Sequence, residues 1–198
     1  MKIIGAIIAG GKSSRMGAHE KAFLELGGKS ILSHVIDHFE PQVDQLFINA
    51  NGKPARFAEF GLKIVPDAMK QLTTPLSGLH AALSYARSAE ADVLVTVPSD
   101  TPFLPADLVV HLMKKTVASG AAIASSGNQD HYIVGAWKTE LLEDLERAIA
   151  KDGLFRVKDW TQRVSAQKVE WPSHPFDPFF NVNTPEDLRT AEQIVSAA

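Results

Sequence analysis

The hydrophobic positions of this chain fall into short continuous apolar runs that alternate with longer segments of helical spacing. Residues 3–9 form such a run, which ends in glycines and is typical of a strand covered on both faces. After Ser30, apolar residues recur every three or four positions until a proline follows, which predicts a helix over residues 31–39. Further strands are predicted over residues 46–50, 62–65, 93–97, 121–124, 132–137 and 166–171.

Helical patterns separate these strands. One pattern covers residues around 79–86, and another covers residues 140–150. Between them we expect a third helix that carries Pro105 in its first turn. The last helix has a local start signal, with Thr184 as the N-cap, a proline at the first helical position, and Asp187 three residues after the cap. Each helix therefore has a predicted place between or after strands.

Strands that alternate with helices predict a mostly parallel central sheet with helices on both faces. We expect a single α/β domain over residues 1–198, with a Rossmann-like three-layer arrangement. In such sheets ligands bind beyond the carboxyl ends of the strands. The segments that directly follow the strands are therefore the place to look for chemistry.

Composition narrows the possible functions. A formal net charge of −3 argues against a partner such as nucleic acid or an anionic membrane. The absence of cysteine excludes disulfides, thiolate metal sites and cysteine nucleophiles. The apolar run at residues 3–9 is too short for a membrane span, and Lys12 and Arg15 follow it without a cleavage pattern, so we expect a cytoplasmic protein.

The loop after the first strand combines glycines with cations. Ala9, Gly10 and Gly11 permit a sharp turn whose successive N–H groups form a concave anion site. Arg15 can bind two phosphate oxygens at once, and Lys21 adds a second positive charge. The loop therefore predicts a polyphosphate site, with an exposed basic loop as the alternative.

A relaxed P-loop pattern over residues 6–13 competes with this interpretation. Its first glycine is replaced by Ala6. Ile7 and Ile8 would also have to belong to the phosphate loop, although they have the character of a strand. The pattern therefore favours a phosphate loop of another kind.

A second candidate site follows the strand at residues 93–97. Three prolines between residues 98 and 105 stiffen this loop and hold Asp100 in one place. A carboxylate at a strand end is a natural ligand for Mg²⁺, which takes one or two carboxylates together with phosphate oxygens and water. The alternative is an aspartate that only structures the loop.

Asn181 and Asn183 lie two residues apart before the last helix. We expect this segment to be extended, so that alternation places both amides on one face, where one of them could reach the metal through its amide oxygen. Turn and cap chemistry is the alternative for this pair. Among the seven histidines, His34 and His38 have a spacing that can bind zinc but no third ligand, so we expect them on a solvated helix face.

Residues 9–21, 98–105 and 181–188 together resemble the molybdenum cofactor guanylyltransferases, and the likeness extends to residues 49–51, 62–67 and 75–79. The resemblance implies a nucleotidyltransferase fold and Mg²⁺-dependent transfer of GMP from GTP to the molybdenum cofactor, with release of pyrophosphate. It further implies that GTP is contacted by Ala9, Gly10, Lys21, Asn49, Asp67 and Asp100, and that Asp100 also holds Mg²⁺.

Two positions depart from that family. Thr74 stands where many relatives have glycine, and Tyr132 replaces a proline in a stretch that resembles an Asp-His-Pro segment on the acceptor side. By this resemblance His131, Asn181 and Asn183 are expected near the acceptor. Contacts with proteins that deliver the cofactor, or with recipient molybdoenzymes, are expected to be transient.

The acceptor's terminal phosphate is expected to attack the α-phosphorus of GTP directly, without a protein nucleophile. Arg15 and the glycine loop would hold the outer phosphates, and Lys21 would stabilise charge at the α-phosphate. The rival enzymes are a cytidylyltransferase for the same cofactor and a sugar-phosphate nucleotidyltransferase. A nucleotide- or cofactor-binding carrier without activity is the alternative from another class.

Overall fold

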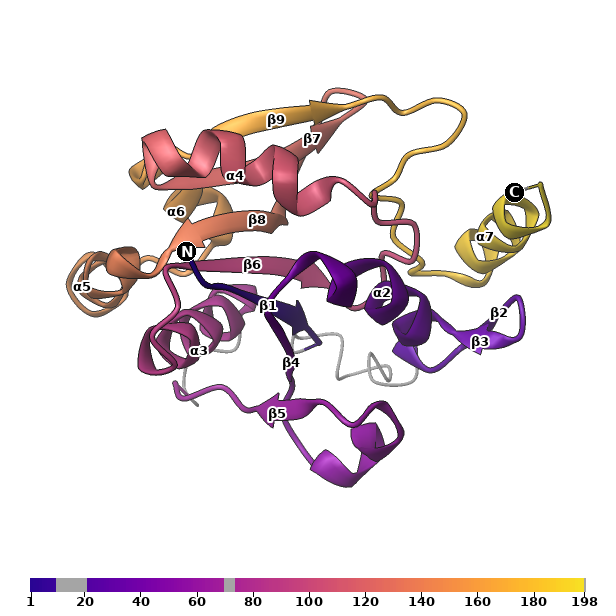
Figure 1. Ribbon diagram of the computed structural model, residues 1–198, viewed down its shortest axis with the longest axis horizontal. Helices are drawn as coiled ribbons and strands as arrows, with labels where there is room; N and C mark the ends of the chain where they lie inside the picture. Colours follow the sequence, from indigo (N-terminus) through magenta and orange to yellow (C-terminus); the bar gives the residue numbers. More distant parts are fainter. Residues whose placement is uncertain (10–20, 70–73, 198) are drawn as a thin grey trace.

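The computed structural model describes residues 1–9, 21–69 and 74–197. Its centre is a seven-stranded sheet (Figure 1). In spatial order the strands are β5 (Lys63–Val65), β4 (Gln45–Asn49), β1 (Ile3–Ile8), β6 (Val93–Pro98), β8 (Gln129–Lys138), β7 (Ala121–Ser126) and β9 (Gln167–Trp171). All seven correspond to predicted strands.

The sheet is mostly parallel, as predicted. Strand β1 pairs in parallel with β4 and β6, β4 with β5, and β7 with β9. Within the described chain β8 alone runs the other way, and it pairs in an antiparallel manner with both β6 and β7. The insertion of β8 between β6 and β7 brings its residues next to the end of β6.

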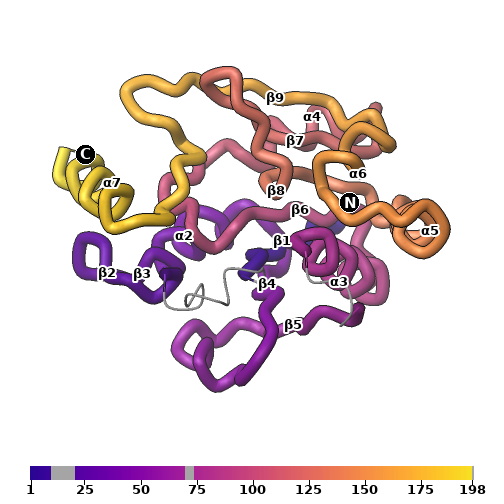
Figure 2. The backbone as a smooth tube through the Cα atoms, turned by 180° about the vertical axis from the view of Figure 1, so that it is seen from behind, coloured from indigo at the N-terminus to yellow at the C-terminus, as the bar shows by residue number. Residues whose placement is uncertain are grey.

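Helices cover both faces of the sheet. Helices α2 (Ile31–Phe39) and α4 (Leu108–Ser119) pack on one face, while α3 (Pro75–Ser88), α5 (Leu142–Asp152) and α6 (Val157–Arg163) pack on the other, which faces the viewer in Figure 2. Alternation along β1 explains the two cores: Ile7 packs with α2 and α4, and its neighbours Ala6 and Ile8 pack with α3. The three-layer α/β arrangement is confirmed.

Helix α7 (Pro185–Ala197) lies at one end of the sheet, beside a small hairpin of β2 (Glu25–Leu26) and β3 (Lys29–Ser30) (Figure 1). Its predicted start is confirmed, because the Asp187 N–H donates to Thr184 Oγ1 at 3.1 Å and the Thr184 N–H donates to Asp187 Oδ2 at 2.8 Å. This reciprocal cap fixes the direction in which the chain enters the helix.

The prediction for Pro105 was wrong. Helix α4 begins at Leu108, and Pro105 lies before it. The reason is a distant cap: the Gln42 side chain donates to the Pro105 carbonyl at 2.9 Å and accepts from the Val109 N–H at 3.0 Å. Helix α6, the 3₁₀ helix Pro54–Phe60 and the β2–β3 hairpin were not predicted, since each is too short to show a clear period.

Among the described residues, none of the helices combines the length and the apolar character that crossing a membrane requires.

Candidate active site

The carboxyl ends of β1, β4, β5 and β6 meet at one edge of the sheet. Ile8 is in register with both Asn49 and Pro98, and Asn49 is in register with Val65. The candidate residues that directly follow these strands therefore lie at the same edge. This is the position at which open α/β sheets bind ligands.

Asp100 lies two residues beyond β6 and is contacted from two distant parts of the chain. The Asn181 side-chain amide donates to Asp100 Oδ1 at 3.3 Å, and the Val182 N–H donates to the Asp100 carbonyl at 2.9 Å. The charge of Lys21 also acts on the Asp100 carboxylate. The structure thus brings together Lys21, Asp100 and Asn181, while Gly10, Gly11 and Arg15 lie outside the described residues.

Burial raises the pKa of Asp100, and its own backbone N–H and then Lys21 oppose that shift without cancelling it. The ionised carboxylate is therefore undercompensated, and an added cation would stabilise it. In the described part of the chain, no group of three or more His, Asp or Glu residues could hold a metal. The residues fit an ion that takes one carboxylate, with its other ligands supplied by phosphate oxygens and water, as Mg²⁺ does.

Asn49 and Asp67 belong to one hydrogen-bonded cluster between β4, β5 and the start of α3. Asn49 is fully buried, and its amide donates to the Val65 carbonyl and to Asp67 Oδ1, each at 3.0 Å. Asp67 Oδ2 accepts from the Ser77 hydroxyl at 2.8 Å and from the Asn51 amide at 2.9 Å. Asn49 thus supports Asp67, whose side chain is half-buried at the same edge.

The backbone of Asn49 also holds Ala9 at the end of β1, because its carbonyl accepts from the Ala9 N–H at 2.8 Å. Gly78 in α3 permits the close packing of this region: a Cβ atom there would stand 2.5 Å from Asn49 Oδ1. Sequence reasoning gave no role to Asn51, Ser77 or Gly78. These three residues could have been identified because they lie in segments 49–51 and 75–79, which resemble the corresponding segments of the family.

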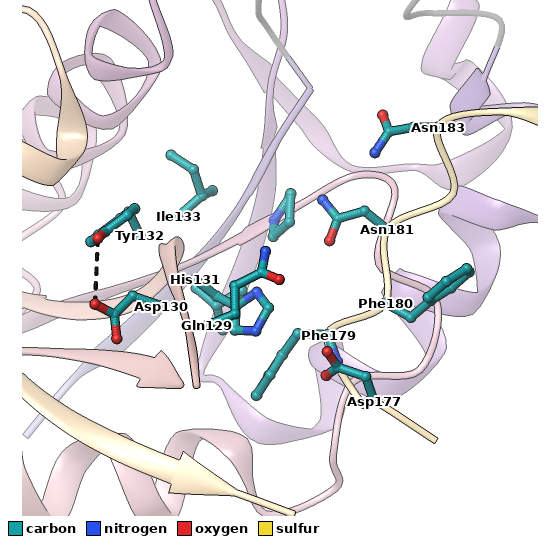
Figure 3. A pocket seen from close by; sticks show the side chains of 12 residues that line it. Gln129, Asp130, His131, Tyr132, Ile133, Asp177, Phe179, Phe180, Asn181 and Asn183 are labelled. Carbon is teal, nitrogen blue, oxygen red and sulfur yellow. Dashed lines mark hydrogen bonds between the residues drawn. The ribbon is translucent and has the colours of Figure 1, made fainter. Parts of the chain in front are cut away.

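A pocket of about 380 Å³ opens between β8 and the segment that leads to α7 (Figure 3). It is lined on the β8 side by residues 129–134, and on the other side by Asp177, Phe179, Phe180, Asn181 and Asn183, with Pro98 at the end of β6. The three residues expected near the acceptor, His131, Asn181 and Asn183, therefore share one pocket.

The extended strand expected around Asn181 and Asn183 is absent from the described structure, where residues 181–183 form a loop. The loop is fixed instead by the buried Val182, whose N–H binds the Asp100 backbone. Both amides nevertheless line the same pocket, and Figure 3 shows them on the same side of the loop. Asn181 connects the pocket with Asp100.

His131 is held by contacts that sequence reasoning missed. Its Nε2 lies 2.8 Å from the Ser126 hydroxyl, which donates to Asp177 Oδ1 at 2.7 Å. The ring packs against Phe179 with a centroid distance of 4.8 Å. Burial lowers the pKa of His131, although the carboxylates of Asp177 and Asp130 act in the opposite direction.

Asp130 on the same wall is paired with Lys168 at 2.8 Å, which lowers the pKa of the carboxyl group. Tyr132, the departure from the Asp-His-Pro pattern, donates its hydroxyl to Asp130 Oδ2 at 3.3 Å (Figure 3). Where the family pattern has a proline, this chain therefore has a tyrosine whose hydroxyl binds Asp130 in the same segment of the pocket wall.

Two alternatives from the sequence lose support. Ile7 and Ile8 belong to β1 and are buried, so they cannot be variable residues of a P-loop. The side chains of His34 and His38 contact the carbonyl groups of Leu26 and His34 at 2.7 and 2.8 Å, respectively. Neither pattern remains a candidate site.

The fold is mostly parallel and three-layered, with a cation and a half-buried carboxylate at the strand ends and a pocket beside them. These features define a nucleotidyltransferase. Residues 5–167 match the model of the MobA-like NTP transferase domain. The chain is 43% identical to a molybdenum cofactor guanylyltransferase of Rhodopseudomonas palustris (strain BisB5), over 95% of this chain and 91% of that protein. The chain belongs to the MobA-like NTP transferase family.

Solved structures agree on the fold. Molybdopterin-guanine dinucleotide biosynthesis protein A from Archaeoglobus fulgidus superposes with a TM-score of 0.74 at 24% identity, covering 98% of this chain and all of that one. A Mycobacterium tuberculosis protein, with a TM-score of 0.66 at 16% identity and 98% of both chains covered, was solved as a complex with manganese.

Proposed function

We propose that this chain transfers GMP from GTP to the terminal phosphate of the molybdenum cofactor, forming the guanine dinucleotide cofactor and pyrophosphate in the presence of Mg²⁺. The observation that carries the proposal is the hydrogen bond from Asn181, which lines the pocket together with His131, to Asp100, whose carboxylate is also influenced by the charge of Lys21. One end suits a nucleotide phosphate chain with its metal, and the other a neighbouring acceptor. The Rhodopseudomonas palustris relative, which is similar over 95% of this chain, is named molybdenum cofactor guanylyltransferase.

On the nucleotide side, the loop that begins at Ala9 binds phosphate oxygens through the backbone N–H groups of Gly10 and Gly11, and Arg15 holds the outer phosphates. Asp67 contacts the nucleoside, and the buried Asn49 keeps its carboxylate in place. Pre-ordered groups of this kind lower the free energy needed to position the substrate.

Asp100 is the protein ligand of the magnesium ion. When bound, the ion neutralises phosphate charge and polarises the α-phosphate. Asp100 suits this role because its carboxylate is half-buried and undercompensated by its neighbours. Lys21 supplies the adjacent positive charge.

On the acceptor side, His131, Asn181 and Asn183 orient the cofactor so that its terminal phosphate faces the α-phosphorus of GTP. The phosphate oxygen attacks, the bond from the α-phosphorus to the bridging oxygen breaks, and pyrophosphate leaves. Lys21 stabilises charge that builds on the α-phosphate during this step. The chemistry is mostly positioning and charge stabilisation, and it needs no covalent enzyme intermediate.

We further infer that the whole chain acts as one domain, that it works in the cytoplasm, where GTP is available, and that proteins delivering the cofactor or receiving the product bind it transiently. The net charge of −3 gives no reason to expect nucleic acid or an anionic membrane as a partner.

Pyrophosphate release tests the proposal. The four nucleoside triphosphates are compared with and without molybdenum cofactor, in Mg²⁺ or in EDTA. We expect release with GTP only when both cofactor and Mg²⁺ are present. A preference for CTP would instead indicate a cytidylyltransferase, and release that does not depend on the cofactor would contradict the acceptor.

A further inference from the structure

The pocket beside Asp100 has an unusual polarity for an enzyme that handles phosphates. Its lining includes the carboxylates of Asp130 and Asp177 and, among the described residues, no lysine or arginine; the nearby Lys168 is already paired with Asp130 at 2.8 Å. A second phosphate site would need cations at this position. The pocket therefore suits an uncharged group that presents hydrogen-bond donors.

The contacts of Ser126 determine which nitrogen of His131 carries a proton. Ser126 is fully buried at the end of β7, and its hydroxyl has one hydrogen to donate. The Asp177 carboxylate, 2.7 Å away, can only accept, so it takes that hydrogen. Ser126 Oγ must then accept from His131, which places the ring proton on Nε2.

The other side of Asp177 strengthens this direction. Asp177 Oδ1 also accepts from the Phe179 N–H at 2.9 Å, so the oxygen is fixed as an acceptor by the backbone. Phe179 packs against the His131 ring at a tilt of 45° and meets Trp171 edge-on at 5.3 Å, which restricts the orientation of the ring. The tautomer and the ring orientation of His131 are thus set together.

In the described part of the chain His131 Nδ1 has no hydrogen-bond partner, and in the neutral Nε2–H tautomer it is an acceptor. The charged groups around the ring are Asp177 from the segment before α7, Asp130 from β8, and Lys168 from β9, which pairs with Asp130. At the His131 end, the pocket wall thus offers Nδ1 as an acceptor beside the carboxylates of Asp130 and Asp177.

We propose that Ser126 and Asp177 are positioning residues that hold His131 as the Nε2–H tautomer, so that the pocket binds the N–H donor edge of the acceptor's pterin ring rather than a phosphate. This inference rests on the proposed function for the identity of the acceptor. It places the ring at the His131 end, and the acceptor phosphate at the Asp100 end. Asn181 contacts both ends, since it lines the pocket and donates to Asp100.

The tautomer is measured first, by ¹⁵N NMR of histidine-labelled protein without substrates, with His131 assigned through His131→Gln. We expect a protonated Nε2 and a bare Nδ1 in the wild type. Addition of 6-hydroxymethylpterin, which has the same donor edge, should shift the Nδ1 resonance, and inorganic phosphate should not. A protonated Nδ1 in the neutral ring, or a response to phosphate instead of the pterin, would overturn the inference.

Kinetics with GTP and molybdenum cofactor provide the second measurement. Ser126→Ala should raise KM for the cofactor about tenfold, which corresponds to one lost hydrogen bond, while KM for GTP and kcat stay within about twofold. It should also change the pH dependence of KM for the cofactor, because the ring loses its fixed partner. Ser119→Ala is the matched control, since it removes the same hydroxyl from a serine whose side chain donates to the Ala121 carbonyl at 2.7 Å, at the opposite end of β7.

Asp177→Asn is the second variant, and it carries the kinetic test should Ser126→Ala not fold. We expect it to change the His131 ¹⁵N pattern and to raise KM for the cofactor as well. Equal increases in both KM values, or no change in either variant, would refute the positioning role. A wild type without guanylyl transfer would refute the proposed function, and the tautomer measurement would still decide on the role of Ser126 and Asp177.

Discussion

Replacing Asp100 with asparagine should move activity and stability in opposite directions. The substitution keeps the size of the side chain and an acceptor for the Asn181 amide, which lies 3.3 Å away. It removes the negative charge. Any change therefore reports on the charge rather than on packing.

The expected loss of activity is about 4 kcal/mol of transition-state stabilisation. Losing one preorganised electrostatic contact typically costs about 3–4 kcal/mol, and a metal ion contributes several. Within the described chain no cluster of three or more His, Asp or Glu residues offers the ion an alternative site. At about 1.4 kcal/mol for each factor of ten, kcat/KM should fall about a thousandfold.

Stability should change the other way. Burial raises the pKa of Asp100, so the folded protein holds that proton more tightly than the unfolded chain does. The ionised group therefore lowers the free energy of unfolding at neutral pH, and Asp100→Asn removes this cost. In EDTA the melting temperature of the variant should exceed that of the wild type, and the difference should shrink as pH falls toward the ordinary value of 3.8.

Calorimetry measures the melting temperatures, and pyrophosphate release measures kcat/KM, on the same preparations of the wild type and the variant. Added Mg²⁺ and GTP should stabilise the wild type and leave the variant nearly unchanged. A variant with near-normal turnover would remove Asp100 from the mechanism. A variant that melts below the wild type in EDTA would contradict the argument from burial.

Three further predictions concern the surroundings of the site. Ser77→Ala removes one of the hydrogen bonds that Asp67 accepts and leaves the one from Asn51 in place. In steady-state kinetics, KM for GTP should rise about fivefold, and kcat should stay within a factor of two. Gly78→Ala places a Cβ 2.5 Å from Asn49 Oδ1. This overpacking should outweigh the gain in helix propensity and lower the free energy of unfolding by about 2 kcal/mol, measured by urea titration. An unchanged free energy of unfolding would refute the close packing. Thr184→Ala removes the cap of α7 and should cost about 1 kcal/mol in the same titration, with Thr190→Ala, inside the helix, as the control.

Local signals explain why so much of the architecture was predictable. The two faces of β1 belong to different cores, and this double burial is already visible as an unbroken apolar run at residues 3–8. The start of α7 was predicted because the two residues of its capping pair, Thr184 and Asp187, are only three positions apart. Asp100 was found by the same logic, since a carboxylate beyond a buried strand can be identified without knowledge of its neighbours.

The sequence by itself thus determined the strands, the helices with a clear period, the α/β class and the strand ends at which chemistry gathers. Tertiary structure alone decided that β8 runs antiparallel between β6 and β7, that Gln42 caps α4, and that Ser126 meets both His131 and Asp177. The physical reason is range. Periodicity and caps act within one or two turns of chain, whereas Ser126 and Asp177 are 51 residues apart and meet only because the packed sheet holds them there.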